Sequence, residues 1–308
     1  MEVHIVQASA TRRQIRFKLP FPTRYLFISP QLILFVGLTI LPFILSLPLL
    51  FTDMSDLNDP QVHQVGLANF VAIFTDPDLG TQFLDALSRT VVFTTLNYLN
   101  IYIFGLCMAL VLYEVGFKGW FFTILYLPMM MSGVALGYVA KMLFAQGTGT
   151  VNLILANLGF GNSPINLNAP EGTAIILALM VGWRYAGFNV AIFLAGLLAI
   201  PKETIEASIV DGTSYWQRLT RIYFPQMVPS FIIASTLLII GSFGVFDELV
   251  ALGGLTVNQG ARFLSILFYS QAFYSRHLAL GMTMAIETFL PLVLIGALLL
   301  ALQRRAQR

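Results

Sequence analysis

Six apolar runs constrain this chain more than any other feature of its sequence. A helix crosses the hydrocarbon core of a bilayer with about 20 residues, and each run is at least that long. Because each run could span a bilayer, we predict an all-α polytopic membrane protein with six transmembrane helices. The runs cover about 26–51, 90–113, 120–144, 173–199, 229–252 and 278–302.

The composition favours the same class. Hydrophobic residues make up 57% of the 308 residues and charged residues only 10%, whereas soluble domains carry about 25% charged residues. A chain this apolar cannot cover its hydrophobic surface inside one water-soluble core. Cys107 is the only cysteine, which excludes an intrachain disulfide and a cysteine-based metal site.

Positive charge gathers on one side of the predicted topology. Most of the 17 Lys and Arg residues fall in the two tails or in the segments after the second and fourth spans. The segment 52–87 contains six Asp and no Lys or Arg. Because Lys and Arg are enriched in cytoplasmic segments, we expect both termini in the cytoplasm, with tails at 1–24 and 304–308.

One long polar stretch, about 201–225, lies between the fourth and fifth spans, on the expected cytoplasmic side. Gly212 favours the end of a first short helix, and Ser214 with Gln217 matches a capping box that starts a second. Phe224-Pro225 predicts the end of that second helix. The stretch therefore reads as two helices joined at a glycine elbow. Its shape is equally consistent with two roles: a connector that rests on lipid headgroups, or an elbow that docks in a socket on a soluble protein.

The residues of this stretch resemble a known motif. Glu206-Ala207-Ser208, followed by Asp211-Gly212 and by Ile222 with Phe224-Pro225, is similar to the EAA loop of permease subunits in bacterial binding-protein-dependent ABC importers. The chain departs from that pattern at Ser208 and Phe224, where the family usually has Ala and Leu. Further similarity to sugar permeases covers about residues 25–305, through Gly66-Leu67-Ala68-Asn69-Phe70, Asp76-Pro77 and Ala195-Gly196-Leu197. Leu127-Pro128 and Phe246-Asp247 resemble the upstream, maltose-type permease of the two-subunit pair.

The resemblance implies a permease domain over 25–303 in the bacterial cytoplasmic (inner) membrane, with a coupling loop at about 201–225. It implies a second permease subunit forming a heterodimer, two cytoplasmic ATPase subunits, an extracytoplasmic solute-binding protein and surrounding lipid, but no nucleic acid. The chain would hold no cofactor, and the partner ATPase would bind ATP and Mg. The residues expected to dock on the ATPase are Glu206, Ala207, Ser208, Asp211 and Gly212.

The residues themselves show no catalytic pattern. The sequence contains no G-x-x-x-x-G-K-[ST] nucleotide-binding loop and no His and carboxylate cluster with metal-ligand spacing. No Ser, His and Asp arrangement resembles a hydrolase. We therefore expect a non-catalytic subunit that depends on ATP hydrolysis by its partners.

Ionisable residues within the spans point to the solute path. Arg184 lies near the middle of the fourth span, and we expect it to form an ion pair with Asp247 or Glu287, to contact the solute, or both. Tyr185 and Asn189 share one helical face, where a ring could stack on sugar C–H groups and an amide could bind hydroxyls. The predicted path comprises Arg184, Tyr185, Asn189, Ser242 and Asp247.

Several alternatives remain open from the sequence. The solute could be a neutral oligosaccharide or an anionic sugar derivative. A secondary active transporter with its own ion-coupling site would need buried carboxylates, of which Glu287 is one candidate. A polytopic membrane enzyme would need a catalytic cluster.

The segments 52–87, 145–172 and 253–277 are expected to face outward and to dock the binding protein.

Overall fold

The computed structural model describes residues 21–59, 61–116, 119–161 and 164–306, and the secondary structure there is helical apart from one isolated β-bridge. The chain divides into two units, Met1–Leu49 and Leu50–Arg308. Most of the predicted N-terminal tail, residues 1–20, lies outside the described residues, as do 307 and 308. The last helix continues to Ala306, so the start of the predicted C-terminal tail is helical.

The first unit is one helical run with local changes of pitch. It comprises α1 (Phe21–Phe35), a π-helical turn η1 (Val36–Ile40) and α2 (Leu41–Ser46). Pro42 occupies the first turn of α2, where its missing N–H has no helical partner to lose. The apolar run Tyr25–Phe51 agrees with the first predicted span.

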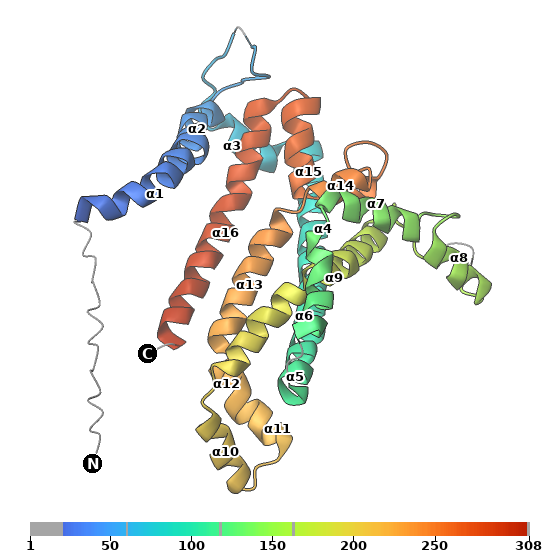
Figure 1. The fold of residues 1–308 in the computed structure, drawn as a ribbon. Helices are drawn as coiled ribbons and strands as arrows, with labels where there is room; N and C mark the ends of the chain where they lie inside the picture. Colours follow the sequence, from blue (N-terminus) through green and yellow to red (C-terminus); the bar gives the residue numbers. More distant parts are fainter. Residues whose placement is uncertain (1–20, 60, 117–118, 162–163, 307–308) are drawn as a thin grey trace, which may run out of the picture. The chain divides into compact units, whose positions relative to one another are not determined.

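The second unit is built on long apolar helices that lie side by side (Figure 1). Together with Tyr25–Phe51, the described residues contain five helical runs long and apolar enough to cross a membrane. Those of the second unit are α4 (Pro77–Asn100) continuing through η3 (Ile101–Gly105) and α5 (Leu106–Val115), α9 (Pro170–Leu198), α13 (Val228–Phe243) with α14 (Asp247–Ala251), and α16 (Leu278–Ala306).

The predicted third span, 120–144, is broken rather than continuous. α6 (Gly119–Tyr126) with its 3-10 extension and α7 (Gly133–Phe144) meet at an angle of 93°. Pro128 cannot donate a helical hydrogen bond, and Ser132 is extended and caps α7 by accepting from the amide of Ala135 at 3.2 Å. The count of potential spans is therefore six only if this bent pair is one of them.

The segment 52–87 is less of a loop than the sequence analysis expected. α3 (Ala68–Thr75) lies within it, and α4 already begins at Pro77. Asp76 caps α4 by accepting hydrogen bonds from the amides of Asp78 and Leu79. An Asp before a Pro is a strong helix-start signal, which the apolar-run criterion overlooked because the first turns of α4 are polar.

The acidic residues before α3 are used within their own loop. The Asp53 carboxylate accepts from the backbone N–H of His63 at 2.7 Å and lies 3.1 Å from its ring. That backbone hydrogen bond is the main cause that lowers the pKa of Asp53. Ser55 donates its amide and hydroxyl to Asp59, which lowers the pKa of Asp59 in the same way.

The segments 145–172 and 253–277 also contain short helices. α8 (Thr150–Asn157) lies in the first, and α15 (Leu264–Tyr269) lies in the second. Leu264 and Leu267 of α15 are buried in a cluster with residues of α3, α4 and α16. The packing of α15 therefore fixes part of the surface that was expected to be open loop.

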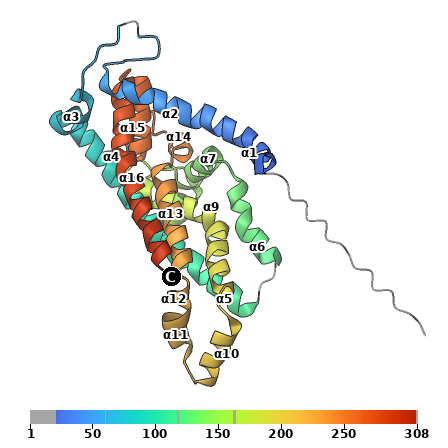
Figure 2. The same cartoon turned by 90° about the vertical axis from the view of Figure 1, so that its left-hand side faces the viewer.

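The central element of the second unit is α9, which packs against α4, α5, α6, α7 and α13. Its side chains Val190, Phe193 and Leu197 are fully buried, and the ring of Phe193 lies 5.4 Å from that of Tyr102. In Figure 2, α9 and α13 run between the short helices α10 and α11 at one end and α15 at the other. This packing holds the polar residues of α9 in a rigid setting.

Candidate functional site

The polar stretch folds as two short helices with a tight turn between them. We call this region, residues 202–218, the elbow. α10 (Lys202–Val210) and α11 (Tyr215–Arg218) flank Gly212, whose φ of 72° lies in the left-handed region. Most other residues adopt that region only at a steric cost. The predicted glycine elbow is confirmed.

Hydrogen bonds among the residues that follow Gly212 make the elbow rigid. The Ser214 hydroxyl accepts from the amide of Gln217 at 3.3 Å, and the Gln217 side chain accepts from the amide of Ser214 at 2.8 Å. This confirms the predicted capping box. Arg218 adds a further bond from its Nη1 to the carbonyl of Thr213 at 2.8 Å.

The five predicted docking residues do not all face outward. Ser208 is buried, and its hydroxyl donates to the carbonyl of Ile205 at 2.6 Å. Its own carbonyl accepts from the amide and hydroxyl of Thr213, so Ser208 supports the turn from inside this chain. The exposed members are Glu206, Ala207, Asp211 and Gly212.

Two exposed apolar side chains near the turn were missed by the sequence analysis. Val210 is 86% exposed and Trp216 is 72% exposed. Val210 lies directly before Asp211-Gly212, and Trp216 lies between Gly212 and the Ile222 end of the motif. Neither residue is part of the motif, so a motif match does not identify them. Large apolar groups left open beside a rigid turn are typical of a surface that another protein covers.

The prediction that Phe224-Pro225 ends the second helix is wrong. A π-helical turn, η5 (Leu219–Tyr223), and α12 (Phe224–Gln226) follow α11 and lead into α13. The wider turn comes just before Pro225, which then sits in the first turn of α12, where no helical N–H is required. The helical backbone therefore continues from the elbow into the apolar helix.

Two tyrosines lie beside Arg218 and Glu114 where the elbow joins the following helix. Tyr223 is buried, and its burial, reinforced by the Glu114 carboxylate, raises the pKa of the Tyr223 phenol. The same two causes raise the pKa of Tyr215. Both phenols therefore stay protonated at neutral pH and remain hydrogen-bond donors.

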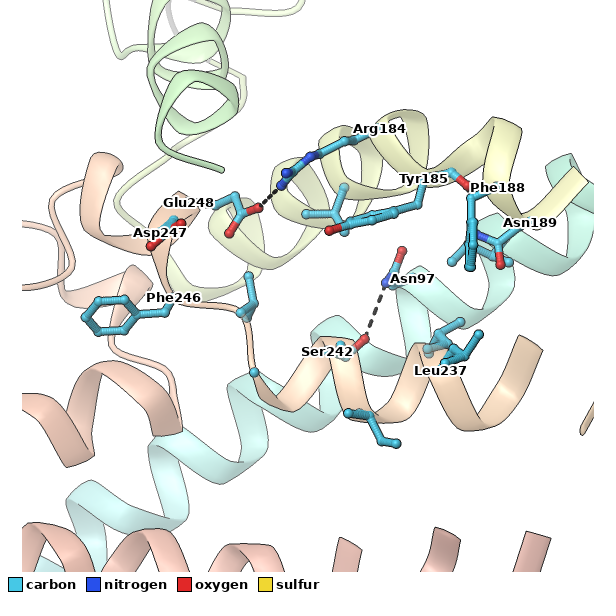
Figure 3. A pocket seen from close by; sticks show the side chains of 17 residues that line it. Asn97, Arg184, Tyr185, Phe188, Asn189, Leu237, Ser242, Phe246, Asp247 and Glu248 are labelled. Atoms are coloured by element: carbon cyan, nitrogen blue, oxygen red, sulfur yellow. Dashed lines mark hydrogen bonds and ion pairs between the residues drawn. The ribbon is translucent and has the colours of Figure 1, made fainter. Parts of the chain in front are cut away.

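A cavity of about 510 Å³ lies between α4, α9, α13 and α14 (Figure 3). We refer to it as the central cavity. Residues far apart in the sequence meet there because α9 packs between the other elements. All five residues predicted for the solute path line it: Arg184, Tyr185, Asn189, Ser242 and Asp247.

One turn and a half of α9 supplies an aromatic and polar wall of the central cavity. Arg184, Tyr185, Phe188 and Asn189 recur at the spacing that places them along one side of a helix. Asn189 is buried, and its amide nitrogen donates to the carbonyl of Tyr185 at 2.9 Å. That bond orients the Asn189 amide, so its oxygen is the group left for other partners.

The ion pair of Arg184 differs from the predicted one. Its Nη1 lies 2.7 Å from the Oε1 of Glu248, not beside Asp247 or Glu287. α14 begins at Asp247, and successive helical side chains point about 100° apart, so Glu248 rather than Asp247 is directed at α9. Glu287 lies on α16, which packs against α13 and α15.

Asn97 of α4 is a cavity residue that the sequence analysis missed. It is buried, its Nδ2 donates to the hydroxyl of Ser242 at 3.3 Å, and its Oδ1 has no hydrogen-bond partner among the described residues (Figure 3). An amide inside an apolar span was the available signal, because such groups are costly in a membrane unless they are used.

The central cavity is suited to binding rather than to covalent chemistry. Its walls combine the rings of Tyr185, Phe188 and Phe246 with amide, hydroxyl and carboxylate groups. Within the part of the chain that the structure describes, no group of three or more His, Cys, Asp or Glu residues could hold a metal ion. Flat apolar faces with polar groups between them match the alternating C–H and hydroxyl surfaces of a sugar.

Known proteins share both the sequence and the fold. The starch degradation products permease AmyD of Thermoanaerobacterium thermosulfurigenes is 25% identical over 92% of this chain and 94% of its own length. The arabinooligosaccharides permease AraP of Bacillus subtilis is 31% identical over 73% of this chain and 70% of its own length.

A crystal structure of a bacterial ABC transporter that imports the acidic polysaccharide alginate contains a similar chain. It superimposes with a TM-score of 0.77 at 25% identity and covers 93% of this chain and 96% of that one. Residues 101–308 match the family described as the inner membrane component of binding-protein-dependent transport systems. This chain therefore belongs to that family and is an inner-membrane permease subunit of an ABC importer.

Proposed function

We propose that this permease forms half of a two-subunit pathway through which a carbohydrate, delivered by an extracytoplasmic binding protein, crosses the inner membrane. The observation that carries the proposal is the central cavity, where all five predicted path residues meet beside aromatic rings. Relatives whose names specify starch products and arabinooligosaccharides support a glycan as the cargo. No comparison favours a secondary active transporter.

The proposal places six spans in the membrane, counting the bent α6 and α7 pair as one, with both termini in the cytoplasm. The excess of basic residues on one side supports this orientation. The central cavity would then lie within the membrane, and the elbow would project into the cytoplasm.

Energy would come from two partner ATPase subunits that bind ATP and Mg. The elbow is the part of the chain suited to receive it, because the exposed Glu206, Asp211 and Gly212 form a rigid projection beside the apolar side chains of Val210 and Trp216. Ser208 would act from inside, by keeping the turn in shape.

To test the proposal, this chain, its second permease, the ATPase and the binding protein are reconstituted together in lipid nanodiscs. ATP hydrolysis is measured with the binding protein empty and then loaded from a panel of neutral and anionic oligosaccharides. We expect at least one glycan to stimulate hydrolysis above the empty binding protein and to be taken up by proteoliposomes. Uptake by this chain without ATP or partners would contradict the proposal.

Substitutions in the central cavity link that activity to this subunit. Tyr185→Ala and Asn97→Ala should each raise the concentration of loaded binding protein needed for half-maximal uptake, or reduce the uptake rate, by about fivefold. The reason is that each removes one stacking or hydrogen-bonding contact worth about 1 kcal/mol. Tyr138→Ala is a matched control, since Tyr138 is an exposed tyrosine on α7 that does not line the cavity.

A further inference from the structure

The charges around the central cavity do not cancel. We propose that Asp247 is the residue that selects the charge of the cargo: its carboxylate leaves the cavity negative, so that neutral glycans pass and anionic ones are disfavoured. The inference rests on the proposed carbohydrate function and narrows it to one chemical class of substrate.

Arg184 is the cation among the described residues that line the cavity, and it is paired with Glu248. Among the residues that line the cavity, Arg184, Asp247 and Glu248 carry charge. Arg184 and Glu248 lie 2.7 Å apart, and their side chains are only 15% and 9% exposed. The guanidinium also lies over the ring of Tyr185, 5.1 Å from its centre. The charge of Arg184 is therefore already matched by the carboxylate of Glu248 within this chain.

Asp247 carries the charge that remains in the lining. Asp247 is exposed, and no Lys, Arg or His of the described chain lies within 4.0 Å of its carboxylate. Figure 3 shows it on α14 beside Glu248, with no dashed line to a partner. The lining thus holds two carboxylates and one guanidinium. A negative field inside low-dielectric walls repels carboxylate, phosphate and sulfate groups.

The amide donors of the cavity lining are already used within this chain. Asn97 gives its Nδ2 to Ser242, and its Oδ1 has no partner among the described residues. Asn189 gives its Nδ2 to its own helix. The Oδ1 of Asn189 and the Asp247 carboxylate are therefore left as acceptors in the lining, whereas Asn97 Oδ1 and Arg184 Nε are buried atoms. Neutral sugars supply hydroxyl donors to such a surface, whereas anionic groups bring only more acceptors.

The field can be measured without transport. In a Cys107→Ser background, which removes the only native cysteine of this chain, Gly241→Cys places one thiol in the cavity lining. A Cβ at Gly241 meets no atom of the described residues within 4 Å, which leaves room for the new side chain. The purified complex in detergent is treated with a cationic and an anionic methanethiosulfonate, and labelling of this chain is followed by mass spectrometry.

We expect the cationic reagent to react faster, after correction for the rates with a free thiol. Asp247→Asn should lower the ratio of cationic to anionic rates by about threefold or more, since it removes one charge from the cavity. Arg184→Gln with Glu248→Gln removes a neutral pair and should keep the ratio. Asp78→Asn, which changes the same charge on an exposed turn of α4 away from the cavity, should also keep it. A ratio near one, or one that Asp247→Asn does not change, would overturn the assignment.

A second measurement tests selection itself. Proteoliposomes with the complete importer are supplied with a neutral gluco-oligosaccharide and with a uronic-acid oligosaccharide of equal length. Asp247→Asn should raise uronate uptake relative to neutral uptake. The two proposals fail separately: glycan uptake with a thiol ratio near one overturns the charge assignment, whereas a negative cavity in a complex that moves no glycan overturns the carbohydrate cargo.

Discussion

Arg184 and Glu248 show how much of this permease depends on single residues. Their ion pair joins α9 to α14 across the wall of the central cavity. Removing one partner of a buried pair leaves the other charge without compensation, which costs about 3–5 kcal/mol. The pair therefore has a structural role whatever the cargo is.

We predict that Arg184→Gln and Glu248→Gln each destabilise the complex, while the double variant is more stable than the sum of the two effects implies. The reason is that the double variant leaves no unpaired charge. Thermal unfolding of the detergent-purified complex, arranged as a double-mutant cycle, measures the coupling. Strictly additive losses would show that the two side chains do not act together.

Gly212 has a left-handed backbone conformation and open space around its Cα, and different substitutions test these two features separately. Its φ of 72° disfavours other side chains, yet a Cβ placed there meets no atom of the described chain within 4 Å. The described residues therefore leave room for a Cβ at this position, whereas backbone strain comes from the turn itself. Asn tolerates the left-handed region better than other non-glycine residues.

We predict that Gly212→Arg abolishes coupled uptake while the chain still inserts in the membrane, and that Gly212→Asn keeps a substantial part of it. Stimulated ATP hydrolysis and uptake by the complete complex report the coupling, and chain abundance in membranes reports insertion. If Gly212→Arg supported normal uptake, the elbow would not be the docking element.

Among the elements, α7 and α14 pack closely through two glycines. A Cβ at Gly133 would lie 2.7 Å from the Cβ of Asp247, and one at Gly137 would lie 2.6 Å from the backbone oxygen of Glu248. Those distances leave no space for a side chain. The bent α6 and α7 pair therefore holds α14 in place and, through it, both acidic residues of the cavity.

We predict that Gly137→Val lowers the stability of the complex by about 1–3 kcal/mol, because it forces α7 away from α14. Gly296→Ala is the control: it lies in α16 with nothing within 4 Å of a new Cβ, and Ala favours a helix by about 1 kcal/mol over Gly. Thermal unfolding compares the two. An equal response to both substitutions would argue against close packing as the cause.

The sequence predicted which segments are helical far better than it predicted the residues at which the helices begin and end, or which side chains pair. The apolar runs and the capping signals of the elbow predicted helices that the structure contains. The early start of α4 and the break before α7 depended on Asp76-Pro77 and on Pro128 with Ser132, local signals that run length does not weigh. The choice of Glu248 over Asp247 depended on where α14 begins, and the sequence pattern does not fix that residue.

At the scale of the whole molecule, the second unit places the elbow and α3 at opposite ends of its long helices (Figures 1 and 2). The proposed orientation puts these ends on opposite sides of the membrane. Asn58 and Glu206 are exposed residues from the two ends, so both suit labelling.

We predict that, in a Cys107→Ser background, Asn58→Cys reacts with a membrane-impermeant maleimide from outside the inner membrane and Glu206→Cys reacts only after the membrane is opened. The distribution of basic residues is the physical reason. Spheroplasts compared with inverted vesicles provide the measurement. The reverse labelling pattern would refute the orientation and with it the cytoplasmic elbow.

The unbroken helical backbone from the elbow through η5 and α12 into α13 has a mechanical consequence. Met227 keeps helical dihedral angles and bonds to Tyr223, so no loose hinge interrupts the path from Tyr215 to Ser242. At 1.5 Å per residue that path is about 40 Å long. Under the proposed docking on the ATPase, this helical path would transmit a displacement of the elbow directly to Ser242 in the wall of the central cavity.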